Sequence, residues 1–122
     1  MKHHFILGFL CLLLIIPLAL SAKRAAPEPV SPVVRNGVNY SVPNDNGRVG
    51  HVVASDDQSG KTLWDIKVFE VQIDPKLEED VQWVFITDLK LVDNVLRIKD
   101  EKSRCYKVDL TTKKVKRQIF CW

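Results

Sequence analysis

The feature that most constrains this chain lies at its start. A basic residue precedes an uninterrupted apolar run from Phe5 to Leu20, and the small residues Ser21 and Ala22 follow. A secretory signal peptide requires a basic start, an apolar centre and small side chains at the cleavage site. We therefore predict a signal peptide at residues 1–22 and a mature chain that folds outside the reducing cytosol, in the periplasm or in the secreted space.

An uncleaved membrane anchor is the alternative interpretation of the same segment. The stretch from Phe5 to Ala22 is eighteen residues long, and a membrane-spanning helix needs about 17 to 25 residues. Pro17, near the end of the run, favours cleavage because proline interrupts a helix ahead of the peptidase site.

The rest of the chain has room for one small domain. Residues 23–32 contain Pro27, Pro29 and Pro32, and this composition predicts an extended tether. Residues 33–122 are then predicted to be a single domain with a modest core.

Short β-rich runs separated by turn residues fill the predicted domain, and none of them has convincing helical spacing. A hairpin is predicted at residues 33–40, because Asn36 and Gly37 tolerate the positive φ of a two-residue turn. A loop is predicted at residues 43–47. Further strands are predicted from Val49 to Ser55, Thr62 to Ile73, Val81 to Val92, Val95 to Lys99, Cys105 to Leu110 and Val115 to Cys121. The pattern predicts a mainly β fold with a small antiparallel sheet or a sandwich.

The spacing of apolar residues predicts three local details. Apolar positions change parity after Val68, which predicts a β-bulge there. Val81, Trp83 and Phe85 are predicted to share one face of a strand, with Gln82 and Asp88 on the other face. Pro75 to Asp80, with proline first and carboxylates after it, is predicted to form one turn of helix.

Two cysteines, Cys105 and Cys121, remain after the predicted signal peptide. In an oxidising compartment an even pair predicts one disulfide, which stabilises a small domain by roughly 3 kcal/mol in the chain-entropy model. Two reduced, partly buried thiols are the alternative. Phe120 and Trp122 flank the second cysteine, and we predict that they pack into the core at the end of the last strand rather than form a docking tip for a partner.

Charge is distributed unevenly along the domain. Residues 45–88 contain ten carboxylates and four basic residues, a net charge of −6, whereas residues 90–122 contain ten basic residues and four carboxylates, a net charge of +6. One interpretation is a basic surface for an anionic membrane, polysaccharide or nucleic acid. The other is that the two halves complement each other or are solvated, since outward lysines also protect sheet edges. The candidate anion-binding residues are Lys113, Lys114, Lys116 and Arg117.

A turn motif stands out between two of the predicted strands. It runs from Ala54 to Trp64, with Asp56 opening the turn, Gly60 near its end and Trp64 in the strand that follows. Aspartate accepts hydrogen bonds from turn amides, glycine adopts a left-handed conformation, and tryptophan offers a large apolar surface. The layout recurs around Asp109, which lies 53 residues after Asp56.

This motif resembles the strand, the Asp-x-x-Thr-Gly-Lys turn and the tryptophan-containing strand of β-propeller blades of the pyrroloquinoline-quinone dehydrogenase type. The second copy has Lys113 where glycine is expected and Arg117 where tryptophan would fall. The span from Ala54 to Asp109 also resembles small, uncharacterised exported bacterial proteins with one or two blade-like units. The resemblance implies blade-like hairpins, and so a partial propeller as a further form of the β fold. It implies no activity and no cofactor, because the matching positions are turn and packing residues.

Residues with catalytic or metal-binding chemistry are sparse. His51 is the only histidine after the predicted signal, and its spacing from Cys105 and Cys121 fits no zinc motif. Two clusters of oxygen ligands, at residues 44–47 and 56–57, lack the alternation of a calcium loop and are predicted to be turns. No metal or cofactor is therefore predicted.

These observations predict a non-catalytic binding or scaffolding module of the cell envelope or secreted space, which receives a protein partner by strand addition at a sheet edge. The alternatives are a small envelope hydrolase that uses the Glu78–Asp80 loop and an electrostatic binder of anionic surfaces. We expect no nucleic-acid partner, and contact with a membrane only through residues 5–22 if these are not cleaved.

Overall fold

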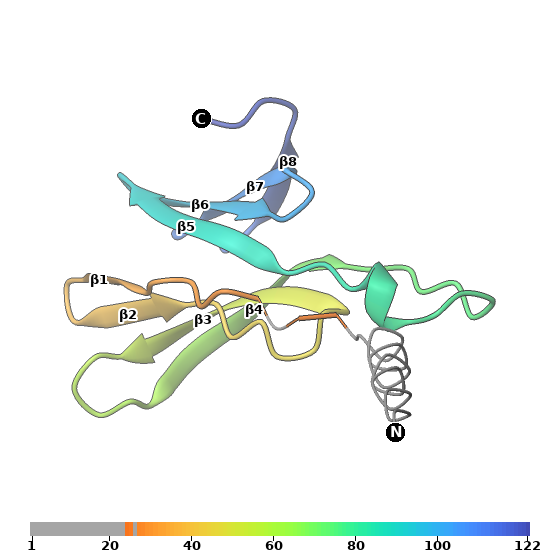
Figure 1. Ribbon diagram of the computed structural model, residues 1–122. Helices are drawn as coiled ribbons and strands as arrows, with labels where there is room; N and C mark the ends of the chain where they lie inside the picture. The colour runs from red at the N-terminus through yellow and green to blue at the C-terminus, as the bar shows by residue number, and fades with distance from the viewer. Residues whose placement is uncertain (1–23, 26) are drawn as a thin grey trace, which may run out of the picture.

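The computed structural model describes residues 24–25 and 27–122, so the predicted signal peptide lies outside the described residues. Eight strands form two four-stranded antiparallel sheets (Figure 1), which confirms the predicted mainly β fold. Sheet 1 contains β1 (Val33–Arg35), β2 (Val38–Ser41), β3 (Val49–Asp56) and β4 (Thr62–Glu70). Sheet 2 contains β5 (Ile86–Val92), β6 (Val95–Asp100), β7 (Cys105–Asp109) and β8 (Val115–Gln118). Each strand pairs with the next along the chain, so each sheet is a meander.

The first hairpin forms as predicted. Asn36 and Gly37 have φ values of +52° and +78°, the left-handed conformation that a two-residue hairpin turn requires at both positions. Val33 therefore pairs with Tyr40, and Arg35 with Val38.

The two sheets lie one above the other (Figure 1), and the core fills the space between their facing sides. Alternate residues of each strand point into this space, for example Val52 and Ala54 of β3 and Leu96 and Ile98 of β6, all of which are fully buried. The buried members of the core are Tyr40, Val42, Val52, Ala54, Val68, Ile86, Leu89, Leu96, Ile98, Tyr106 and Val108.

A β-bulge interrupts the pairing of β3 with β4, as predicted. Gly50 pairs with Phe69, and the next residue, His51, pairs with Lys67, so that Val68 is left without a partner in the register. Both Val68 and Phe69 consequently pack against the core. The Phe69 ring stacks on Tyr106 of sheet 2, with the ring centroids 5.3 Å apart.

The predicted strand from Val81 is wrong over its first five residues, because β5 begins only at Ile86. Asp80–Gln82 forms a short 3-10 helix, labelled η3, instead. Val81 is 64% exposed whereas Phe85 is 6% exposed, so they do not share a buried strand face. The helical turn predicted for Pro75 to Asp80 is also wrong, because the observed 3-10 helix begins only at Asp80 and ends at Gln82.

The Pro-rich segment has no regular secondary structure over its described residues, but it contacts the domain. The guanidinium of Arg24 donates two hydrogen bonds to Glu101, at 2.5 and 2.6 Å, and lies 4.8 Å from the centre of the Phe85 ring. Val30 packs against the core. Within the described residues, no helix has the length and apolar character that a membrane crossing needs.

The predicted disulfide between Cys105 and Cys121 is present, with the two Cα atoms 5.5 Å apart. The prediction for the residues around Cys121 is wrong. Strand β8 ends at Gln118, and Phe120 is 84% exposed and Trp122 39% exposed. The disulfide joins the end of the chain to Cys105 of β7 after the last strand has ended. The Phe120 and Trp122 side chains therefore do not reach the core.

Candidate functional site

The two copies of the turn motif connect the third strand to the fourth in each sheet. In the first copy, Asp56 Oδ1 accepts hydrogen bonds from the amides of Gln58 and Ser59, each at 2.9 Å. In the second, Asp109 Oδ1 accepts from the amides of Thr111 and Thr112, at 2.8 and 3.1 Å. These bonds hold the pKa of both aspartates below its usual range.

In both sheets, a backbone hydrogen bond also joins the turn motif to the turn of the first hairpin of that sheet. The amide of Asp57 donates to the carbonyl of Gly37 at 2.9 Å, and the amide of Leu110 donates to the carbonyl of Asn94 at 3.0 Å. Trp64 follows the first turn, and its ring centroid lies 5.9 Å from that of Tyr40. The motif residues Asp56, Gly60, Trp64 and Asp109 therefore act in turn formation and packing.

A row of cations lies on the side of sheet 2 that faces away from sheet 1. Lys90 of β5, Arg97 of β6, Lys107 of β7 and Lys116 of β8 are consecutive partners in the strand register. Each of them has at least one apolar neighbour along its strand that packs into the core, so these four side chains point outward. At about 4.8 Å between strands, the four cations form a row about 14 Å long.

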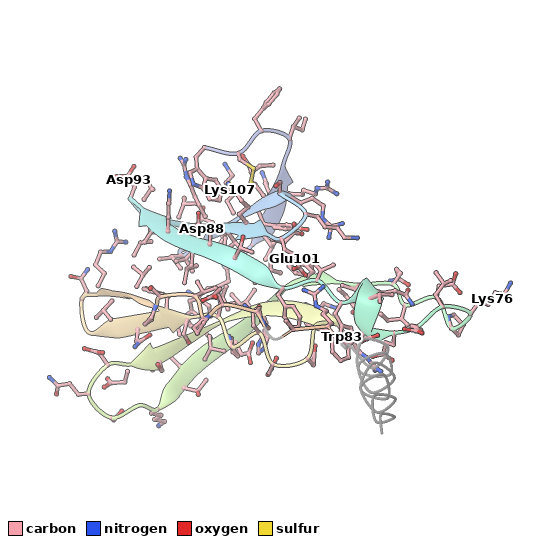
Figure 2. All side chains as sticks on the ribbon, viewed as in Figure 1. Lys76, Trp83, Asp88, Asp93, Glu101 and Lys107 are labelled. Atoms are coloured by element: carbon pink, nitrogen blue, oxygen red, sulfur yellow. A yellow bond between two sulfur atoms is a disulfide. The ribbon has the colours of Figure 1, made fainter. Side chains whose placement is uncertain are left out.

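A fifth cation, Lys99, lies on the same side one step along β6, and we call these five residues the basic face. None of them forms an ion pair with another residue that the structure describes. Two carboxylates lie on the same side, Asp88, which is the register partner of Lys99, and Asp109, which lies two residues from Lys107 in β7. The five cations outnumber them, so the face has a net positive charge. Figure 2 shows Lys107 between the sheet and the C-terminal segment.

The C-terminal segment, residues 119–122, lies against the basic face. The Trp122 ring centroid is 6.0 Å from Nζ of Lys90, 5.9 Å from Cζ of Arg97 and 6.0 Å from Nζ of Lys99. These are cation–π distances. A concavity of about 220 Å³ separates the segment from the sheet and is lined in part by Arg97, Lys107, Phe120 and Trp122.

The four candidate anion-binding residues do not share one surface. Lys116 belongs to the basic face, and Lys114 lines a second concavity of about 270 Å³ beside it, together with Lys107 and Lys116. Lys113 instead lies with Nζ 5.5 Å from the centre of the Trp64 ring. Arg117 lines a cleft of about 470 Å³ between the sheets, with Lys102, Arg104 and the Phe69 and Tyr106 side chains.

Sequence reasoning therefore missed four of the five basic-face residues. A usable signal was present, because Arg97 and Lys99 alternate with buried Leu96 and Ile98 in β6. Lys90 and Lys107 show the same alternation in their strands. No ion pair within the described part of the chain joins a carboxylate of residues 45–88 to a cation of residues 90–122, so the two charged halves do not neutralise each other by direct contact.

The acidic loop at Glu78–Asp80 makes structural contacts. Glu79 accepts hydrogen bonds from Arg48, at 2.5 and 2.6 Å, and from the Trp83 indole at 3.0 Å. These contacts lower the Glu79 pKa, whereas a general acid needs a raised one. The loop projects away from both sheets, with Lys76 at its tip in Figure 2.

His51 lies between two carboxylates on the outer side of sheet 1, an arrangement that the sequence did not predict. Its Nδ1 is 2.8 Å from Asp65 and its Nε2 is 3.1 Å from Asp45. Burial lowers the His51 pKa, but the hydrogen bonds and charges of the two aspartates outweigh burial and raise it. Among the described residues no group of three or more His, Cys, Asp or Glu side chains is placed to hold a metal ion.

Comparison with known proteins does not add a function to this geometry. No protein-family model matches the chain, and no curated protein matches its sequence.

Proposed function

We propose that this protein is a non-catalytic binding module of the cell envelope or secreted space, and that it binds an anionic surface through the basic face. The single observation that carries the proposal is the register row of Lys90, Arg97, Lys107 and Lys116. Like charges directly opposite each other on neighbouring strands are destabilising. A bound polyanion would remove this repulsion, so that folding and binding are coupled through the same four side chains.

Heparin, a soluble polyanion, tests this proposal. In the face variant Lys90, Lys107 and Lys116 are each replaced by glutamine, and in the control variant Lys61, Lys76 and Lys102 are replaced in the same way. Five of the six lysines are exposed and Lys107 is half-buried, and both variants lose three charges. We expect the face variant to bind heparin about tenfold or more weakly and to lose about three units of the slope of log K against log salt. Equal losses in the two variants would show that the net charge, and not the face, is responsible.

A second candidate function is strand addition, and one observation favours it. The edge strand β4 is nine residues long and pairs only with β3 among the described residues. Its Leu63 side chain is 50% exposed. An open edge of this length is a template for an extended peptide. A photo-crosslinking residue at position 63 should capture a protein in exporting cells, and the same residue at Leu77, which is 60% exposed on the projecting loop, should not. Capture at both positions or at neither would reject this function.

The resemblance to propeller blades stays a proposal. It is supported by the four-stranded meander of each sheet and by the Asp-initiated turn between the third and fourth strands in both. A closed propeller needs about four to eight blades, and the described chain contains two sheets. The two units are therefore proposed to form a partial propeller.

We also propose that the protein is exported. Two observations support this proposal, the basic, apolar and small residues that follow one another in segment 1–22 and the disulfide. Intact mass of the protein from envelope and medium fractions tests it. We expect loss of the first 21 or 22 residues and a two-hydrogen deficit that reduction restores. A full-length mass with free thiols would show that the signal peptide is not cleaved and that the protein does not fold in an oxidising compartment.

A further inference from the structure

The most exposed apolar side chains of the described chain stand beside the basic face. Ile119 is 91% exposed and Phe120 is 84% exposed. They follow β8 directly, at the point where the chain leaves the sheet. Figure 1 shows this segment beyond sheet 2, on the side opposite sheet 1, and Phe120 shares a concavity with Arg97 and Lys107 of the basic face. The cations and the apolar pair therefore project toward the same side of the molecule.

The two residues that follow the apolar pair fix its position, Cys121 through the disulfide and Trp122 through its contacts with the cations. Cys121 is bonded to Cys105, which is buried at the start of β7. Trp122 then lies against Lys90, Arg97 and Lys99. Residues 119 and 120 thus form a short loop closed at both ends, and little conformational freedom remains to be lost when the loop meets a partner.

We infer that the partner of the basic face is an anionic lipid bilayer, into which Ile119 and Phe120 insert while the five cations contact lipid phosphates. This inference rests on the proposed function. A polysaccharide would engage the cations and leave both apolar side chains in water. A nucleic acid offers a stacking surface to Phe120 and no environment for Ile119. Of these three anionic partners, only a bilayer supplies negative charge at its surface and an apolar interior a few ångströms below it.

Trp122 fits the same geometry. Tryptophan is enriched at the boundary between lipid headgroups and hydrocarbon, because its ring is apolar and its indole N–H is polar. Here its ring lies about 6 Å from three of the cations and shares a concavity with Phe120 of the apolar loop. The three elements of a membrane-contacting surface are therefore present side by side: cations, an interfacial ring and an apolar tip.

Vesicle binding separates this inference from the proposed function. The probe vesicles are phosphatidylcholine with and without phosphatidylglycerol, and the chain begins at Lys23 so that the apolar run at residues 5–20 does not bind lipid itself. All eight strands and the disulfide lie within this chain. In the tip variant Ile119 and Phe120 are replaced by serine. In the control variant the serines replace Leu77 of the projecting loop, which is 60% exposed, and Val81 of η3, which is 64% exposed.

We expect binding to vesicles that contain phosphatidylglycerol, and about tenfold or greater weakening in the tip variant, because two side chains lose their burial in lipid. The control variant should bind like the wild type, and the tip variant should still bind heparin like the wild type. A tip variant with unchanged vesicle binding would overturn the membrane inference. So would binding to heparin without binding to anionic vesicles, and in both cases the proposed function stands. Binding to neither probe would reject the proposed function and the inference with it.

A measurement on the full chain gives an independent readout. In proteoliposomes, hydrogen exchange of residues 119–122 should slow when phosphatidylglycerol is included, and this slowing should be absent in the tip variant. Equal exchange in neutral and anionic proteoliposomes would contradict insertion even if the chain is anchored by residues 5–22.

Discussion

Gly60 and Lys113 hold the same position in the two Asp-initiated turns, and both have positive φ, +77° and +63°. The amide of each donates to the carbonyl of the aspartate that opens its turn, at 2.8 Å for Gly60 and 2.7 Å for Lys113. Glycine adopts this conformation freely, whereas the Cβ of a lysine makes it strained. The aspartate cap therefore imposes the same backbone on both turns, and the second turn keeps it against the preference of its lysine.

We predict that replacing Lys113 by glycine gives a more stable protein than replacing it by alanine. Both changes remove the contact of Lys113 with Trp64 and its hydrogen bond to the Leu110 carbonyl, but only glycine relieves the left-handed strain. The free energy of unfolding should differ by about 1 kcal/mol between the two variants. Urea denaturation measures this difference. An alanine variant as stable as the glycine variant would mean that the position is not strained in solution.

Features that depend on local chemistry were predictable from the sequence. The hairpin at Asn36 and Gly37 requires only two residues that tolerate positive φ, and the bulge follows from a parity change that ends at Val68. Features that depend on distant contacts were not. Trp83 does not continue a strand, because its ring packs on Gly47 and its indole donates to Glu79. Sequence alternation favoured the strand and could not reveal these partners.

The basic face illustrates the same limit for the site. Each of its cations occupies an outward position that alternation identifies in a single strand. Their alignment depends on the register of four strands, and the register of β6 with β7 places Arg97 opposite Lys107. Counting charge along the chain favoured the cluster at Lys113 to Arg117 instead, whose members point to different surfaces.

A second prediction concerns the close approach of Gly50 to Phe69. A Cβ atom on Gly50 would lie 2.3 Å from the edge of the Phe69 ring, which is held by its stack on Tyr106. Gly50→Ala should therefore lower the free energy of unfolding by about 1 to 3 kcal/mol. In the Phe69→Leu background the same change should be less destabilising, because the clashing ring is gone. A double-mutant cycle from urea denaturation measures the coupling, and additive losses would contradict the contact.

A third prediction concerns the disulfide. The bond between Cys105 and Cys121 closes a loop with a sequence separation of 16, and its replacement by two serines should lower the free energy of unfolding by roughly 3 kcal/mol. The same change should release Trp122 from the basic face and so shift its fluorescence, measured with Trp64 and Trp83 replaced by phenylalanine, toward that of a solvated indole. Reduction of the wild-type protein should reproduce both effects. A variant with wild-type stability and emission would contradict the pinning of the C-terminal segment.

The last prediction is a pH dependence that belongs to one residue. His51 is the only histidine in the chain from Lys23 onward, and its two ring nitrogens both face carboxylates, Asp65 at 2.8 Å and Asp45 at 3.1 Å. Only the imidazolium can donate to both, so the pKa of His51 is raised in the folded protein although burial opposes the rise. Lys67, opposite His51 in the register, is itself paired with Glu70 at 2.8 Å.

The stabilising effect of a raised pKa is complete below the pKa of the unfolded chain, about 6.5 for histidine, and is lost as the pH rises through the higher folded value. Melting temperatures measured from pH 5 to pH 9 should therefore fall across the neutral range in the wild type. They should stay nearly level there in His51→Gln, which cannot be charged, and in the double variant Asp45→Asn, Asp65→Asn the fall should be much reduced. An NMR titration gives the pKa of His51 directly. A value at or below 6.5 would mean that the two aspartates do not hold the ring, and the pH dependence would then need another source.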